Sequence, residues 1–258
     1  MKLKTTILII STTLFFACQS NTSNEKSTEL KVLYTKDIED QKAAELVSTM
    51  MDAMGGSKEW EGLKYVSWTF FGARHLVWDK MNNRVRIESP KDSSIYLVNL
   101  NDGTGKYAYN GQETLKSEKL VERLKRGKSI WINDMYWLFM PFKLYDQGVT
   151  VKYLGSDTTL IGVKADVLEL TFDQVGNTPE NKYEVFVDAE EHLIKQWRFF
   201  KEAKQDTASR TWPWDNYKDH NGLMLSSERT DSSGPSNVRV YDYLDDKVFT
   251  SFEPFSFY

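Results

Sequence analysis

Short runs of alternating apolar and polar residues, separated by turn pairs, fill most of this chain. In the run 65–71, for example, Val66, Trp68 and Phe70 alternate with polar residues. Similar runs of strand length occur at 76–79, 84–88, 95–98, 149–154, 165–172, 183–187, 193–200, 223–229 and 238–244. Turn pairs such as Asn110-Gly111 and Asn221-Gly222 separate several of them. Short strands joined by close turns are typical of antiparallel sheets, and we expect about ten strands.

Helical periodicity is confined to a few segments, and we expect two or three helices. Apolar residues recur at helical spacing from Asp37 to Met54, with Asp37 as the cap and Gly55-Gly56 as the end. A second, short helix is expected to begin at Ser117 and to end at Gly127. The run 135–140 is apolar at every position, so it must be buried on all sides or cover an apolar surface. The pattern indicates an α+β fold.

The N-terminus has the features of an export signal. Two lysines precede an apolar run that ends at Ala17, and this run is shorter than the roughly 20 residues that span a bilayer. Cys18 follows directly, as in a bacterial lipoprotein signal, and would become the lipid-bearing first residue of the mature chain. An ordinary signal peptide followed by a chance cysteine is the alternative. Cys18 is the single cysteine of the chain, so no disulfide competes for it.

Three segments follow from this interpretation. Residues 1–17 form the lipoprotein signal peptide, residues 18–32 a flexible polar tether, and residues 33–258 one folded domain. Loss of the two leader lysines from the 33 basic residues leaves 31 against 37 acidic ones, a net charge of −6. This balance gives no electrostatic footprint for nucleic acid. Attachment to the membrane would therefore come from acyl chains on Cys18 rather than from charge.

Signatures of catalysis are absent from the sequence. No nucleophile elbow occurs, and His75, His192 and His220 lie on separate segments without metal-ligand spacing. The stretch 215–222 lacks the closing glutamate of a calcium-binding loop and is interpreted as a hairpin. We therefore expect no catalytic residue, no metal and no cofactor.

The high aromatic content is the clearest indication of function. Aromatic residues make up 14% of the chain, with eight tryptophans. Three of those on strands and three on the covering segment are expected to face one another: Trp68, Phe70 and Trp78, and Trp131, Trp137 and Phe139. Such rings either fill a core or wall a cavity. We hypothesise that they line a pocket for acyl or other apolar ligands.

Several segments together resemble the LolA/LolB-like lipoprotein-carrier superfamily, and within it a lipoprotein subgroup. They are the helix ending in Gly55-Gly56, the segment 60–66 with its sequence WEGLKYV, the block 136–144, the Val187-Asp188 hairpin and the Asn221-Gly222 turn. This resemblance implies a strongly curved antiparallel sheet, a half-barrel with helices on its concave side. It also implies an apolar concave surface that receives lipid or acyl chains.

The sequence therefore favours a non-enzymatic lipoprotein of the bacterial outer membrane that binds an apolar ligand in a half-barrel. Two alternatives stay open. Trp212 and Trp214, which flank a proline, could stack on sugar rings as a surface glycan-binding module, or could pin a loop. A purely structural envelope protein, with every aromatic ring packed, is the other alternative.

Overall fold

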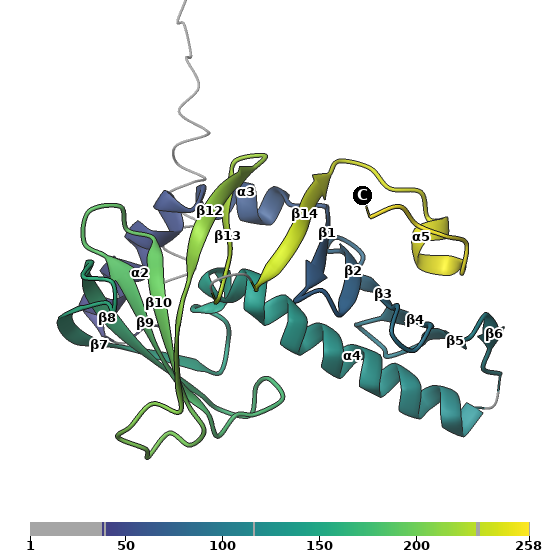
Figure 1. Ribbon diagram of the computed structural model, residues 1–258, viewed down its shortest axis with the longest axis horizontal. Coiled ribbons are helices and arrows are strands. Elements are labelled where there is room, and N and C mark those ends of the chain that lie inside the picture. The colour runs from purple at the N-terminus through teal and green to yellow at the C-terminus, as the bar shows by residue number, and fades with distance from the viewer. Residues whose placement is uncertain (1–37, 39, 116, 231–232, 258) are drawn as a thin grey trace, which may run out of the picture.

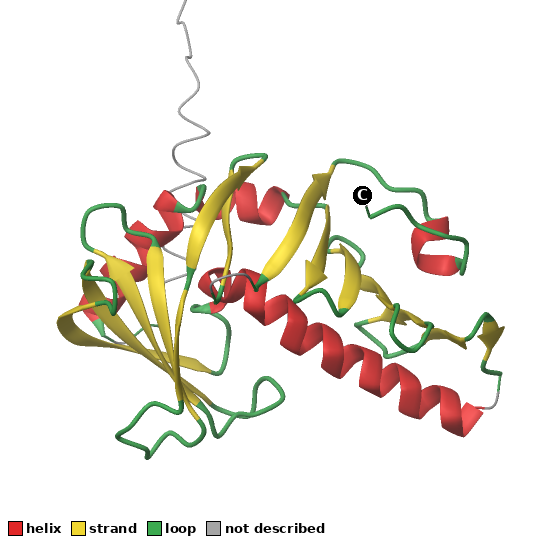
Figure 2. Cartoon of the chain, viewed as in Figure 1, coloured by secondary structure: helices red, strands yellow, loops and turns green. Residues whose placement is uncertain are grey.

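The computed structural model describes residues 38, 40–115, 117–230 and 233–257. The expected signal peptide, Cys18, the tether and the Asp37 cap lie outside these residues. Within the described part, four α-helices and one 3-10 turn accompany fourteen strands in three antiparallel sheets (Figure 2). In these same ranges no helix has both the length and the apolar character needed to cross a bilayer.

In the large sheet, six strands that follow one another along the chain form a meander, and a strand from near the C-terminus pairs with the first of them. Its seven strands run in the order β14-β1-β2-β3-β4-β5-β6. The strands are β1 (Tyr65–Phe70), β2 (Arg74–Asp79), β3 (Arg84–Ser89), β4 (Ser94–Asn99), β5 (Gly105–Tyr109), β6 (Gln112–Glu113) and β14 (Pro235–Tyr241). Val66, Trp68 and Leu76 are fully buried on the face that contacts the helices.

The small sheet is a second meander, formed by the middle of the chain. Its five strands run in the order β11-β10-β9-β8-β7. They are β7 (Val149–Thr158), β8 (Lys164–Phe172), β9 (Lys182–Asp188), β10 (Ile194–Phe200) and β11 (Arg210–Pro213). Val149 pairs with Phe172 at the end where β7 begins.

A hairpin links the two sheets. It consists of β12 (Asp215–His220) and β13 (Leu223–Glu228), and it lies between the small sheet and β14 in Figure 1. Asn221 and Gly222 at its turn have φ values of 56° and 88°, the left-handed conformation of a tight hairpin. The turn expected at these two residues is therefore present.

Helix α2 (Gln41–Ala53) packs against β7 of the small sheet. Asp40 caps the helix by accepting a hydrogen bond from the Ala43 amide, and it also accepts one from the Tyr153 amide of β7. Gly55 follows with φ 108°, and a Cβ there would lie 2.0 Å from the Gly222 carbonyl oxygen. Glycine is therefore required at this turn, which leads into α3 (Gly56–Gly62).

Helix α4 (Ser117–Phe139) is the long helix beneath the large sheet in Figure 1, and it continues into the 3-10 turn η1 (Met140–Lys143). The expected helix end at Gly127 is wrong. Gly127 instead permits close packing, because a Cβ there would lie 3.0 Å from Cδ1 of Tyr96 and from Cγ2 of Val98 on β4. A glycine that resembles a stop in sequence is here the contact point between helix and sheet.

The C-terminal end of α4 lies between the two sheets. The Phe139 ring contacts Trp78 of the large sheet, with 5.8 Å between ring centroids. The Trp137 ring contacts Trp197 of the small sheet, with 5.0 Å between ring centroids. The run 135–140 is apolar at every position because this part of the chain packs in both directions.

The C-terminal segment covers the other face of the large sheet. It contains α5 (Lys247–Thr250), and its Phe249 and Phe257 pack with Val77 in a small separate core. The fully buried Arg86 of β3 donates hydrogen bonds to three carbonyl oxygens of the segment 248–253, at 2.8–3.1 Å. This cation therefore fixes the end of the chain to the sheet.

The α+β class and the large antiparallel sheets are confirmed, whereas one half-barrel of about ten strands is not. No closed barrel is formed by the described residues, whose strands divide into a large sheet, a small sheet and a hairpin. The strands missing from the expectation are β5, β6, β11 and β12. β6 has two residues, β11 contains Pro213, and β12 is almost wholly polar, so none of these three strands has the alternation of apolar and polar residues that marks a strand.

Candidate functional site

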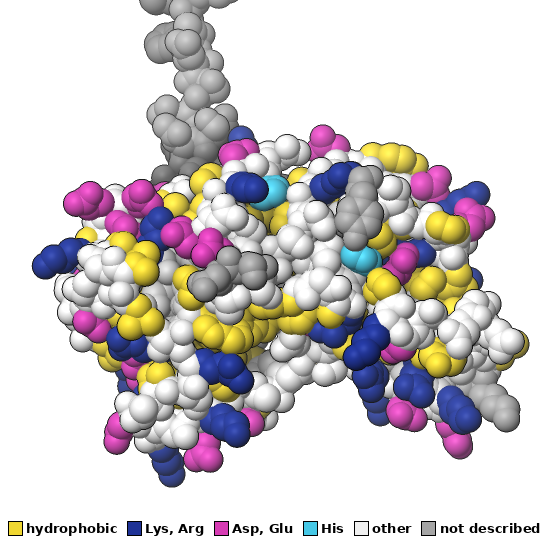
Figure 3. Space-filling view, viewed as in Figure 1, with side chains coloured by type: hydrophobic (Ala, Val, Ile, Leu, Met, Phe, Trp, Pro, Cys, Tyr) yellow, Lys and Arg dark blue, Asp and Glu magenta, His cyan; other side chains and the backbone are white. Residues whose placement is uncertain are grey.

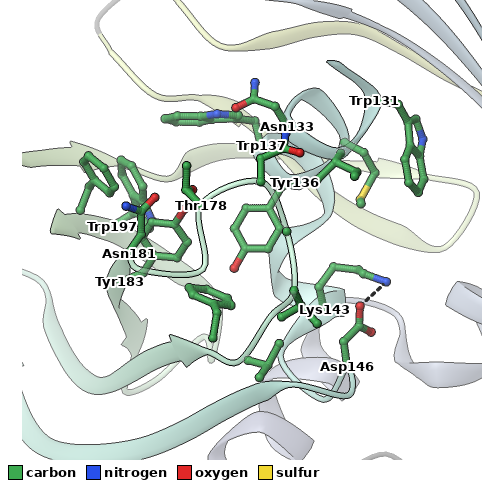
Figure 4. A pocket seen from close by; sticks show the side chains of 18 of the residues that line it. Trp131, Asn133, Tyr136, Trp137, Lys143, Asp146, Thr178, Asn181, Tyr183 and Trp197 are labelled. Carbon is green, nitrogen blue, oxygen red and sulfur yellow. Dashed lines mark ion pairs between the residues drawn. The ribbon is translucent and has the colours of Figure 1, made fainter. Parts of the chain in front are cut away.

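A pocket of about 510 Å³ lies between the C-terminal half of α4 and the small sheet. Its apolar lining consists of Trp131, Ile132, Met135, Tyr136, Trp137, Val149, Phe172, Val175, Tyr183, Trp197, Phe199, Trp212 and Trp214. In Figure 4, Tyr136 projects into the middle of the view, with Tyr183 and Trp197 on one side and Lys143 on the other. Pockets of this size and lining are typical of sites for small apolar ligands.

Five rings form the main wall, and we call them the open cluster: Tyr136, Trp137, Tyr183, Trp197 and Trp212. Trp137 is the centre of this cluster, with its ring centroid 5.0 Å from that of Trp197 and 5.3 Å from that of Trp212. Tyr136 lies 5.7 Å from Tyr183 between ring centroids. Neighbouring residues on α4 thus contact different strands of the small sheet, which sets the spacing between helix and sheet.

The rim of the pocket is polar and exposed. Asn133, Gln147, Asn177, Thr178 and Arg210 line it. The loop 173–181 between β8 and β9 crosses from the small sheet to α4, where the Asn177 side chain donates a 2.8 Å hydrogen bond to the Ser129 carbonyl. Figure 3 shows the surface notched at its lower edge between the small sheet and α4, with apolar side chains gathered above the notch.

The two phenols of the open cluster stay protonated at neutral pH. Burial raises the pKa of Tyr183 to about 12. Burial also raises the pKa of Tyr136 well above its ordinary value, and the nearby Tyr183 and Asp146 act in the same direction. Both hydroxyls are therefore neutral groups that can donate or accept a hydrogen bond.

A buried arginine supports the pocket wall from behind. The Arg229 guanidinium lies 3.3 Å from the ring centroid of Trp214 and donates a 2.6 Å hydrogen bond to the Trp137 carbonyl. Burial lowers the pKa of Arg229 to about 9, so the group is still charged at neutral pH. It also donates to the Ser226 hydroxyl at 2.8 Å. The cation thereby joins β13 to the C-terminal end of α4, whose carbonyl dipoles favour positive charge.

The six aromatic residues singled out from the sequence divide between two places. Trp131 and Trp137 line the pocket. Trp68, Trp78 and Phe139 pack instead with Trp60 and Phe142 in a group that we call the sealed cluster. Phe70 is partly buried, under the Arg74 guanidinium at 4.7 Å from its ring centroid. The structure therefore brings two of the six together at the pocket.

Sequence reasoning missed most of the wall on the small sheet, namely Phe172, Tyr183, Trp197 and Phe199, and singled out Trp212 for a different role. Their signal is the alternation of large aromatic residues on β10, where Trp197 and Phe199 stack at 5.7 Å between ring centroids. The same alternation occurs on β1, at Trp68 and Phe70, yet Trp68 belongs to the sealed cluster. The pattern alone does not distinguish a core from a pocket.

The other candidate sites have structural explanations. Trp214 is 2% exposed, and Trp212 packs against Trp137, so these two residues do not form an exposed platform for sugars. The stretch 215–222 forms the linking hairpin. In the described ranges no three His, Cys, Asp or Glu side chains gather as a metal site would require.

Comparison with known proteins finds no matching family model and no matching curated protein. The solved structures that match include the following two. A DUF1329 family protein from Desulfovibrio piger matches with a TM-score of 0.43 and 12% identity, over 80% of this chain and 97% of that one. A LolA superfamily protein from Nitrosomonas europaea matches with a TM-score of 0.34 and 11% identity, over 79% of this chain and 97% of that one. The second belongs to the superfamily that the sequence resembles. At these TM-scores neither likeness supports a function, which must come from the pocket.

Proposed function

We propose that this protein binds an apolar ligand, an acyl chain or a lipid, in the pocket between α4 and the small sheet. One observation carries the proposal. Five large rings converge there from a helix and three strands and yet leave a cavity of about 510 Å³. Burial of each methylene group of a ligand in such a cavity contributes about 0.8 kcal/mol.

A binding role is favoured over catalysis by the chemistry of the lining. Lys143 and Asp146 are paired at 2.6 Å, so neither is free to act as a base. The Tyr136 and Tyr183 hydroxyls are held in their neutral form. The lining therefore supplies apolar contact and hydrogen bonding rather than a nucleophile with an adjacent base.

The N-terminal sequence supplies the proposed location. Acylation at Cys18 would hold the protein at the bacterial envelope as an outer-membrane lipoprotein, with the polar tether 18–32 between the lipid and the folded body. The proposed ligand would then be taken from, or delivered to, that membrane.

Two neighbouring substitutions test the pocket. Val149 lines the cavity at the start of β7, whereas the next residue, Thr150, is exposed. Successive strand residues point to opposite faces, so Val149→Trp fills the pocket and Thr150→Trp does not. Binding of a fluorescent fatty acid to the purified, delipidated protein is the measurement.

We expect the wild type and Thr150→Trp to bind the probe with similar affinity, and Val149→Trp to bind it at least about tenfold more weakly. Circular dichroism establishes that both variants are folded. A wild-type protein that does not bind the probe overturns the proposal. Equal binding by both variants would place the ligand elsewhere.

A further inference from the structure

The charges that line the pocket are not balanced. The charged side chains among its lining are Lys143, Asp146 and Arg210. Lys143 and Asp146 neutralise one another in their ion pair. Arg210 makes no ion pair with any residue of the described ranges. The pocket therefore has one uncompensated positive charge, and that charge is at its rim.

The Arg210 guanidinium has a defined position against the aromatic wall. It lies over the ring of Trp212, 5.3 Å from the centroid, and Trp212 belongs to the open cluster. The contact between a cation and an aromatic face is attractive and keeps the planar guanidinium beside the rim. Its donors are suited to a carboxylate or phosphate, which can accept two parallel hydrogen bonds from the group.

The size of the cavity limits the apolar part of the ligand. Pockets that bury one ligand of the size of a drug molecule have volumes of about 300–1,000 Å³. The cavity of about 510 Å³ lies in the lower half of this range. Its size therefore suits one acyl chain better than the several chains of a larger lipid.

We propose that the pocket selects a single-chain amphiphile with an anionic head, such as a free fatty acid, and that Arg210 is the residue that determines this preference. The chain lies against the open cluster, and the head lies at the rim, where Arg210 pairs with it. The neutral Tyr136 and Tyr183 hydroxyls do not repel the anion. This inference rests on the proposed function, because it names the ligand class of the same pocket.

The test compares a fatty acid with the fatty alcohol of the same chain length, in competition against the fluorescent probe. At about pH 8 the acid is ionised, and the alcohol differs from it by lacking the charge. The variants are Arg210→Gln and, as the matched control, Arg239→Gln. Arg239 is an exposed arginine on β14, away from the pocket lining, and its loss changes the net charge equally.

We expect the wild type and Arg239→Gln to bind the acid about tenfold more tightly than the alcohol. Arg210→Gln should bind both ligands with the affinity that the wild type has for the alcohol. Equal binding of acid and alcohol by the wild type overturns the inference and leaves the proposed function intact. A preference for the acid that persists in Arg210→Gln also overturns it. Binding of neither ligand by the wild type contradicts the proposed function itself.

Discussion

Two aromatic clusters flank the C-terminal end of α4, and they differ in whether a third element covers them. The sealed cluster on the large sheet is covered by α3 and η1, because Trp60 of α3 stacks on Phe142 of η1, with 4.8 Å between ring centroids. Its residues are at most 5% exposed. No helix in the described part of the chain covers the open cluster on the small sheet in this way. The polar loop 173–181 crosses its rim, and a cavity is left beneath.

The comparison shows that the aromatic composition of a cluster does not determine whether it forms a filled core or lines a pocket. Both clusters contain tryptophans and other large rings from strands and from the same helix. Phe139 and Trp137 are only two residues apart on α4, yet one belongs to the sealed cluster and the other to the open one. The placement of α3 and η1 over one sheet but not the other determines which cluster is filled and which leaves a cavity.

The largest expected effect distinguishes the clusters by their stability. Phe139→Ala should reduce the free energy of unfolding by about 3–5 kcal/mol, because it creates a cavity in a filled core. Trp137→Ala should cost less, since its ring already borders empty space. Urea unfolding of both variants is the measurement. Equal losses would mean that the two clusters are packed to the same degree, and the comparison would fail.

An effect of intermediate size on stability depends on whether water reaches the rings of the open cluster. The pKa of Tyr183 is raised to about 12 by burial, so above about pH 10 the phenol ionises in the unfolded chain first. This ionisation favours the unfolded state, and stability should fall between about pH 10 and about pH 12. Tyr183→Phe should remove part of that fall, as measured by urea unfolding across this range. An unchanged pH dependence in the variant would indicate a water-filled wall.

The smallest expected effect concerns the loop across the rim. Asn177→Ala removes the hydrogen bond to the Ser129 carbonyl, at an exposed position, and should change the free energy of unfolding by no more than about 1 kcal/mol. Release of a bound fluorescent fatty acid should nevertheless become faster, because the loop is no longer tied to α4. Stopped-flow dissociation is the measurement. An unchanged release rate would mean that the loop does not control the pocket entrance.

Local signals in the sequence predicted the elements that depend on local chemistry. The Asn221-Gly222 turn and the apolar stripe of α2 are present because conformation and periodicity are properties of short segments. The cap of the described helix α2 is Asp40, which also accepts a hydrogen bond from the amide of Tyr153, far along the chain. Long-range contacts of this kind are not visible in a local pattern.

The errors occurred where two elements meet. Gly127 has the appearance of a helix end, and only the proximity of Tyr96 and Val98 shows its role. The alternation on β1 identified Trp68 as an inward-facing residue but did not reveal that other rings fill the space around it. Selection of pocket residues requires knowledge of what covers each sheet, and that information is distributed over the whole chain.

Arg86 ties the C-terminal segment to one face of the large sheet. Because its guanidinium donates to three carbonyl oxygens of the segment 248–253, this segment is fixed to the face of the large sheet rather than being a dispensable tail. A chain cut before Lys247 would retain every described strand and yet remove the three carbonyl acceptors of Arg86, leaving the cation with its Glu88 ion pair. Any tag or fusion at this end therefore has to leave those carbonyls in place.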